Sequence, residues 1–204
     1  MPRRRKSGKT PQAAAGSPPG RLRIVAGNWR SRVLEVADVE GLRPTAERVR
    51  ETLFNWLAPR IEGARCLDLF AGTGALGFEA LSRGAAHVTF VERSPAAVST
   101  LRSNAATLGA NADIRNENAF DYLGRPPEGP FDIVFLDPPF ADERLADLCK
   151  ILTDGGFLAR NARVYVEEDR GRDTAVPGEG WETLRQKTAG NVRYSLLRRA
   201  DATK

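Results

Sequence analysis

Cysteine and histidine are scarce in this chain of 204 residues. The only cysteines are Cys66 and Cys149, and the only histidine is His87. Cys66 falls in an expected strand and Cys149 on the apolar face of an expected helix, so we expect two buried, reduced thiols and no disulfide. Because no cluster of cysteine and histidine residues exists, we also expect no zinc or other metal site.

Long hydrophobic runs are missing as well. No apolar stretch approaches the roughly 20 residues that cross a bilayer, so we expect no membrane partner. The basic N-terminus is not followed by the apolar segment of a signal peptide, so we expect no such peptide and predict a cytoplasmic protein. A hydrophobic content of 41% and a charged content of 28% are typical of a soluble globular protein.

Acidic residues are absent from residues 1–20, which carry five basic ones. Residues 21–60 hold eight basic and five acidic residues, residues 61–180 hold twelve and nineteen, and residues 181–204 hold six and two. Basic ends and an acidic middle suit a protein whose ends contact phosphate. For residues 1–20 we predict a disordered basic leader, with loose attraction to phosphate and plain solubilisation as its two alternative roles.

Strand and helix patterns alternate along most of the chain. We predict one domain over residues 21–204, in which an N-terminal hairpin and helix (21–60) precede a core (61–204). Repeated strand–helix units in the core predict a mostly parallel sheet with helices on both faces, followed by an antiparallel pair. The expected core strands cover residues 66–69, 88–92, 112–116, 131–137, 164–166, 181–187 and 192–197, and the expected helices cover 75–82 and begin near 95, 119 and 145.

Basic residues crowd the segment before the core. Two short strands around Gly27–Ser31 predict a hairpin, and a helix is expected from Thr45, as its N-cap, to about Ala58. Basic side chains beside an aromatic ring would give a nucleic-acid surface its phosphate contacts and a stacking face. The alternative is that the ring packs on the body and the basic groups are merely solvated. The candidates for RNA contact are Arg21, Arg23, Trp29, Arg30, Arg32, Arg43, Arg48 and Arg50.

One apolar strand ends at an acid, two prolines and an aromatic ring, in the sequence FDIVFLDPPF at residues 131–140. Pro138 and Pro139 cannot donate ladder hydrogen bonds, so the strand must end near Asp137. The result is a stiff loop at a strand tip that offers a carboxylate, a carbonyl and the ring of Phe140. A proline-rich strand exit without function is the plainer alternative.

Polar side chains follow four successive strands, at Asp68, Glu92, Asn118 and Asp137. In parallel sheets the carboxyl ends of the strands line one crevice, where ligands bind. Residues 72–77 read G-x-G-x-x-G, with Glu92 twenty residues after Gly72, which indicates a nucleotide whose ribose binds the acid. A glycine-rich turn without a ligand is the alternative. A carboxylate at Asp68 repels phosphate and attracts a sulfonium, which favours S-adenosylmethionine over NAD.

Several stretches resemble known methyltransferases. DLFAGTGALG at residues 68–77 resembles the first motif of class I methyltransferases, and DPPF at 137–140 resembles the [DN]PP[FY] motif of enzymes that methylate exocyclic amines. About residues 21–200 of the chain resemble the bacterial RsmD family. This family methylates the N2 amine of one guanine in small-subunit (16S) ribosomal RNA. The stretches that carry this second resemblance are RIVAGNW at 23–29, GLRPT at 41–45, RVRETLFNWL at 48–57 and GALGFEALSR at 74–83. The long basic leader departs from the family pattern.

The resemblance implies a Rossmann-like class I methyltransferase fold, with a seven-stranded sheet, a C-terminal antiparallel hairpin and an N-terminal hairpin extension. It implies S-adenosylmethionine as the cofactor and ribosomal RNA, or the small subunit or its assembly intermediate, as the partner of a monomer. The methionine part of the cofactor would contact Asp68, Gly72 and Gly74, with Ala71 in the same set. The ribose would contact Glu92, and the adenine Asn118 and Ala119, beside Arg93. The implied catalytic loop is Asp137, Pro138, Pro139 and Phe140.

The chemistry of these residues agrees with amine methylation. An exocyclic amine is a poor nucleophile, because its lone pair is delocalised into the ring. The Asp137 carboxylate and the Pro138 carbonyl can each accept one N–H and so stabilise the charge that grows on nitrogen. Phe140 can stack on the base, which must be single-stranded or flipped. The alternatives are methylation of adenine N6, an NAD(P)-dependent oxidoreductase, and a non-catalytic RNA-binding protein on the same fold.

Overall fold

The computed structural model describes residues 20–39, 45–139, 144–171 and 180–200. Near the N-terminus, β1 (Arg21–Arg23) and β2 (Val33–Glu35) pair antiparallel. The main sheet has seven strands, in the order β5-β4-β3-β6-β7-β9-β8. Its strands are β3 (Arg65–Asp68), β4 (His87–Glu92), β5 (Ala112–Asn116), β6 (Phe131–Leu136), β7 (Leu158–Asp169), β8 (Trp181–Ala189) and β9 (Val192–Arg199).

Five strands of the main sheet, β3 to β7, run parallel, and β9 and β8 are antiparallel to their neighbours. The predicted seven-stranded, mostly parallel sheet with a C-terminal antiparallel pair is therefore confirmed. β3 lies between β4 and β6, so the chain winds outward from β3 in one direction and then returns to wind in the other. At such a reversal point the loops after the strands diverge and leave a crevice at the carboxyl edge.

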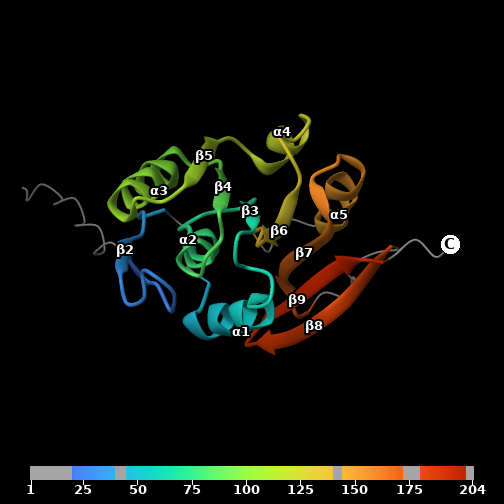
Figure 1. The fold of residues 1–204 in the computed structure, drawn as a ribbon, viewed down its shortest axis with the longest axis horizontal. Coiled ribbons are helices and arrows are strands. Elements are labelled where there is room, and N and C mark those ends of the chain that lie inside the picture. The colour runs from blue at the N-terminus through green and yellow to red at the C-terminus, as the bar shows by residue number, and fades with distance from the viewer. Residues whose placement is uncertain (1–19, 40–44, 140–143, 172–179, 201–204) are drawn as a thin grey trace, which may run out of the picture.

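Helices cover both faces of the sheet (Figure 1). One apolar cluster joins a face of the sheet to α1 (Glu47–Leu57), α2 (Ala75–Ser82) and α3 (Pro95–Leu108). A second cluster joins the other face to α4 (Ala119–Leu123) and α5 (Leu145–Asp154). The middle strands β3 and β6 contribute to both clusters, which explains their continuous apolar sequences.

Local sequence signals set the bounds of α3. The Ser94 hydroxyl accepts a hydrogen bond from the Ala97 N–H at 3.4 Å, and Pro95 occupies the first turn, where it loses no helical hydrogen bond. Gly109 ends the helix with a φ of 61°, a conformation that favours glycine. The helix predicted to begin near residue 95 therefore begins directly after its capping residue, Ser94, and ends directly before Gly109.

The N-terminal hairpin is bound to the C-terminal half of α2. The buried Glu79 carboxylate accepts hydrogen bonds from the Val25 and Ala26 N–H groups at 2.8 and 3.0 Å. The Ser82 carbonyl accepts from the Asn28 N–H at 2.7 Å. These bonds lie between residues more than 50 positions apart, so they fix the hairpin to the core.

Three sequence expectations differ from the structure. β7 has 12 residues instead of the three expected, because its first half is polar and carries no strand pattern. β1 and β2 have only three residues each. Thr45 is not the N-cap of α1, which begins after Ala46 without a side-chain cap. Cys66 and Cys149 are buried, as predicted, and burial raises the pKa of both thiols.

Among the helices of the described residues, none is long and apolar enough to cross a bilayer. Within the same ranges, no group of three or more His, Cys, Asp or Glu side chains is placed to hold a metal ion.

Candidate active site

The glycine-rich turn after β3 is shaped by close packing. Gly72 and Gly74 have φ angles of 51° and 76°, and Gly74 is the N-cap of α2. A Cβ atom on Gly77 would lie 2.2 Å from the Phe90 ring of β4. Glycine at this position lets α2 approach the sheet closely, which directs the N-terminus of α2 at the carboxyl edge.

Asp68, the last residue of β3, lies beneath this turn. Its carboxylate accepts a hydrogen bond from the Gly77 N–H at 3.0 Å, which satisfies one of the first-turn amides of α2. Burial is the main cause that raises the pKa of Asp68 to about 7. The Gly77 N–H opposes the rise, and the negative charges of Asp137 and Glu92 add to it. A buried carboxyl in this state gains from a nearby cationic ligand, which would stabilise its ionised form.

Glu92, at the end of β4, ties the glycine-rich turn to the next helix. One carboxylate oxygen accepts from the Gly72 N–H at 2.8 Å and the other from the Ser94 N–H at 2.7 Å. The nearby Ala71 is buried and donates its N–H to the Val91 carbonyl at 3.0 Å. Each oxygen of Glu92 keeps a further acceptor site, so the carboxylate can still accept two hydroxyl groups from a ligand.

Asn118 begins α4 beside the end of β4. Its side-chain oxygen accepts from the Asp121 N–H at 3.0 Å, which is an N-cap, and its amide group donates to the Asp121 carboxylate. Ala119 is buried, and Arg93 is exposed. Their role in binding an adenine stays a prediction.

Asp137 follows β6 at the middle of the carboxyl edge. Its carboxylate accepts a hydrogen bond from the Thr45 hydroxyl at 3.3 Å, across 92 positions of sequence. Burial raises the pKa of Asp137 to about 6, and the Thr45 hydroxyl opposes the rise. Pro138 is buried and Pro139 exposed, which suits a stiff strand exit. Phe140 lies outside the described residues.

Two functional candidates were not predicted from the sequence, Thr45 and Glu167. Thr45 reaches Asp137 only through the fold, so no local pattern indicates the contact. Glu167 follows the apolar run 164–166 of β7, just as Asp137 follows that of β6, so a fifth polar residue after an apolar strand was an available signal. Burial and the charge of Asp137 raise the pKa of Glu167 to about 8.

The structure divides the predicted RNA-contact residues. The exposed ones are Arg21, Arg23, Arg30, Arg32 and Arg48. Trp29 is half-buried and packs against the apolar core. This agrees with the alternative prediction, in which the ring packs on the body of the protein. Arg43 lies outside the described residues.

Arg50 was expected to contact RNA at the surface, and the structure shows that this expectation is wrong. Its side chain is buried, donates to the Arg23 carbonyl at 2.8 Å and lies 3.8 Å from the Glu79 carboxylate. Burial lowers the pKa of its guanidinium, and the charge of Glu79 opposes that change. Arg50 therefore holds the hairpin to the core, and it leaves the set of residues expected to contact RNA.

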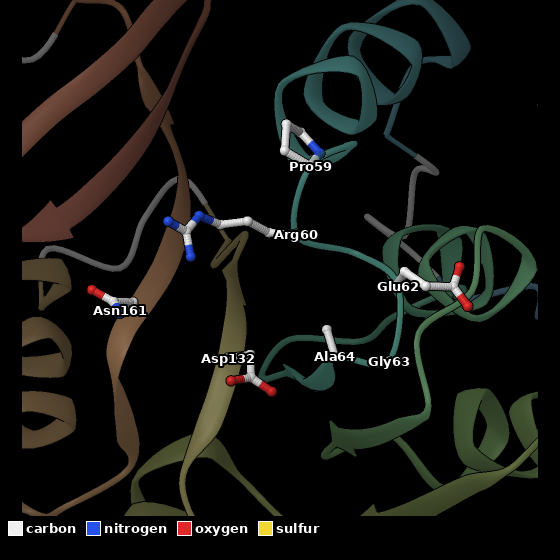
Figure 2. Close-up of a pocket in the computed structure, with 7 residues that line it drawn as sticks. All are labelled: Pro59, Arg60, Glu62, Gly63, Ala64, Asp132 and Asn161. Carbon is white, nitrogen blue, oxygen red and sulfur yellow. The ribbon is translucent and has the colours of Figure 1, made fainter.

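A hollow of about 240 Å³ lies at the opposite edge of the sheet (Figure 2). Its lining comes from residues 59–64, between α1 and β3, and from Asp132 and Asn161 of β6 and β7. Asp132 stands at the start of β6, whereas Asp137 follows its end. The hollow therefore lies at the opposite ends of the strands from Asp68, Glu92 and Asp137.

Known proteins resemble this chain over most of its length. A model of the family described as Conserved hypothetical protein 95 matches residues 22–198. The ribosomal RNA small subunit methyltransferase D of Escherichia coli (strain K12) is 49% identical over 181 residues, which are 88% of this chain and 91% of the relative. The protein of the same name from Haemophilus influenzae is 46% identical, over 87% of this chain and 93% of the relative.

Solved structures resemble the fold. The putative methyltransferase yhhF of Escherichia coli has a TM-score of 0.82 and 46% identity, and the match covers 88% of this chain and 98% of that one. A putative RNA methyltransferase from Pyrococcus horikoshii has a TM-score of 0.63 at 21% identity, over 81% of this chain and 92% of that one. At that identity the second likeness concerns the fold alone.

Proposed function

The chain belongs to the RsmD family, described as Conserved hypothetical protein 95, and we propose that it transfers a methyl group from S-adenosylmethionine to the N2 amine of a guanine in small-subunit ribosomal RNA. The observation that carries the proposal is Asp137-Pro138 at the carboxyl edge of a class I methyltransferase sheet, at the end of the strand that pairs with β3, which the glycine-rich turn follows. Relatives at 46% and 49% identity, both called ribosomal RNA small subunit methyltransferase D, favour this reaction over adenine methylation, hydride transfer and simple RNA binding.

The residues around the turn fit S-adenosylmethionine. Asp68 is a buried carboxyl that a cationic ligand would stabilise, so it suits the amino and sulfonium groups. Glu92 has acceptor sites for two ribose hydroxyls, and Gly72 and Gly74 allow close approach to the backbone. The proposed adenine contacts are Asn118 and Ala119, beside Arg93, and Ala71 stays with the residues proposed for the methionine part.

The bound cofactor supplies an electrophilic methyl group on a sulfonium. The Asp137 carboxylate and the Pro138 carbonyl each accept one N–H of the target amine, which favours a tetrahedral nitrogen with its lone pair directed at the methyl group. With the cofactor bound, that lone pair would take the methyl group while the electrons of the S–C bond stay on sulfur, and the methylated nitrogen would release one proton to water. Asp137 stabilises the positive charge on nitrogen during transfer, because its own charge is fixed there beforehand.

The exposed arginines of the hairpin and of α1 are proposed to contact RNA phosphates. Arg21, Arg23, Arg30 and Arg32 lie on or beside the hairpin that Glu79 fixes to α2, and Arg48 lies in the first turn of α1. Thr45, just before α1, contacts Asp137, so α1 connects this basic surface to the catalytic loop. The proposal retains Arg43, Phe140 as the stacking ring, and a monomer that acts in the cytoplasm on the small subunit or its assembly intermediate.

Transfer of labelled methyl from S-adenosylmethionine tests the function directly. The acceptor is small-subunit ribosomal RNA, free and in subunits, from cells that lack the protein. After digestion to nucleosides, we expect the label in N2-methylguanosine. Label in N6-methyladenosine would overturn the choice of base, and absence of any transfer would overturn the reaction.

A further inference from the structure

Glu167 of β7 is a buried carboxyl that the proposed reaction does not use. Leu136 of β6 pairs with Val166 of β7, so the next positions, Asp137 and Glu167, are neighbours on adjacent strands and share one face of the sheet. Only 6% of Glu167 is exposed. A second carboxyl therefore lies beside the catalytic one, within the body of the protein.

Each of the two carboxyls has its own hydroxyl donor. The Tyr165 hydroxyl donates to Glu167 at 2.7 Å, and the Thr45 hydroxyl donates to Asp137 at 3.3 Å. Tyr165 is held by the ring of Phe135 on one side and the ring of Tyr194 on the other, each with its centroid 6.4 Å away. Aromatic packing thus fixes the donor that orients Glu167.

The surroundings of Asp137 and Glu167 limit how many negative charges the two carboxyls can carry together. Within the described part of the chain, the titratable groups next to Glu167 are Asp137 from β6, Tyr165 on its own strand and Tyr194, its register partner on β9. The carboxyl of Asp68 is the next one beyond Asp137. Two neighbouring carboxylates in a buried place repel each other, so the second ionises only at a higher pH than the first.

We propose that Glu167 is a positioning residue for methyl transfer, which shares one proton with Asp137 and holds that proton itself at neutral pH. The pair then carries one negative charge, and that charge is on Asp137, where the target amine binds. This inference rests on the proposed function of the site. The directions of the pKa shifts agree, since Asp137 ionises at about 6 and Glu167 at about 8.

The test compares Glu167→Gln with Tyr165→Phe. Glutamine keeps an oxygen that accepts from Tyr165 but cannot ionise, so it imitates the protonated carboxyl. In carboxyl carbon NMR of the ligand-free protein, we expect two coupled titrations in the wild type and loss of the upper one in Glu167→Gln. Tyr165→Phe should move the upper titration to higher pH, because the ionised Glu167 loses a hydrogen bond. An upper titration that persists in Glu167→Gln would overturn the proposal.

Single-turnover methyl transfer shows whether the pair serves the reaction. The wild-type rate should rise as Asp137 ionises and rise again near pH 8, because a second charge then lies beside the nitrogen that becomes positive. Glu167→Gln should keep the first rise and lack the second. Inactivity of this variant at neutral pH, with cofactor binding intact, would mean that ionised Glu167 is required and would contradict the proposal. If the wild type transfers no methyl, the proposed function fails, while the NMR titration still decides the shared proton.

Discussion

Individual carboxyl groups determine the chemistry of the crevice. Asp68, Glu92, Asp137 and Glu167 all come from the carboxyl edge of the main sheet. Each is held by hydrogen bonds from backbone N–H groups or from hydroxyls, and burial raises the pKa of three of them, Asp68, Asp137 and Glu167. A site with this much buried acid is suited to a cationic ligand and to a reaction that develops positive charge.

Replacement of Asp137 distinguishes two possible roles of its carboxylate, that of a hydrogen-bond acceptor and that of a general base. We expect Asp137→Ala to lower the single-turnover rate of methyl transfer by about a hundredfold or more, the scale for loss of one preorganised electrostatic contact. Asp137→Asn should be milder, because its amide oxygen still accepts one N–H. Cofactor affinity should be close to wild type in both variants. Equal and severe losses would instead identify Asp137 as a general base, since neither variant can take a proton.

The buried carboxyl of Asp68 is expected to lower the stability of the ligand-free protein and to strengthen cofactor binding. Its pKa in the folded protein, about 7, lies above the ordinary 3.8, so the unfolded state binds fewer protons between these values and stability falls as the pH rises through this range. Asp68→Asn removes this penalty and keeps an acceptor for Gly77. At pH 8 we expect about 4 kcal/mol more stability without ligand and weaker binding of S-adenosylmethionine. Denaturant unfolding at pH 4 and pH 8 checks this, because the gain should vanish at the lower pH.

Residues at strand ends were predictable, and residues brought together by the fold were not. Asp68, Glu92 and Asp137 follow apolar strands, so the parallel sheet that the sequence predicts also places them at one edge. Thr45 was wrongly predicted to be the N-cap of α1, because its hydrogen-bond partner, Asp137, stands 92 positions away in the sequence. Arg50 was wrongly expected on the surface, because its buried carboxylate neighbour comes from another helix.

Among the elements, α2 has contacts at both ends. Its first turn receives Asp68 and borders the glycine-rich turn, while its last turn binds the N-terminal hairpin through Glu79 and Ser82. The hairpin passes so close that a Cβ atom on Gly27 would lie 1.8 Å from the Ser82 carbonyl oxygen. One short helix thus connects the proposed cofactor site to the proposed RNA-binding hairpin.

A matched pair of glycine variants measures this close approach. Gly27 and Gly63 both have positive φ, 83° and 70°, but a Cβ atom on Gly63 would meet nothing within 4 Å. Gly63→Ala should therefore lose only about 1 kcal/mol, from backbone strain. Gly27→Ala should lose about 2 kcal/mol more, because the hairpin must also move away from α2. Equal losses in denaturant unfolding would mean that the hairpin adapts without leaving the helix.

Most elements were predicted from periodicity and from end signals such as Pro95 and Gly109. β7 was the exception, since Leu158–Asp169 pairs with β6 through an irregular register and only its second half is apolar. Pairing with β6 holds the polar first half in the sheet, while β9 pairs with the second half. Such tertiary contacts have no signature in the local sequence.

On the scale of the whole molecule, the basic hairpin and the acidic crevice are joined through α1 and α2. The hairpin carries exposed arginines, and the crevice carries buried carboxyls. Such a division lets the protein attract RNA with one surface and bind a cationic cofactor in another place.

Paired charge removals test the RNA surface. We expect Arg30→Gln with Arg32→Gln to weaken RNA binding and to reduce the slope of log K against log salt by about 1.4, the scale for two lost contacts to single-stranded phosphate. The control removes Arg125 and Lys150, two exposed basic residues after α4 and in α5. In Figure 1, α4 and α5 lie on the other side of the molecule from β2 of the hairpin. The control should leave the slope unchanged, and cofactor affinity should not change in either variant. Equal slopes in both variants would make the hairpin arginines ordinary surface charge.

The central claim is that this protein methylates a guanine of small-subunit ribosomal RNA through Asp137. Mass mapping of that RNA tests it most directly, in cells that lack the protein and receive either the wild-type chain or Asp137→Ala. The account predicts one guanosine that lacks a methyl group on N2 without the protein, regains it with the wild-type chain and regains little or none with Asp137→Ala. Small-subunit RNA that carries the same methyl groups with and without the protein would contradict it.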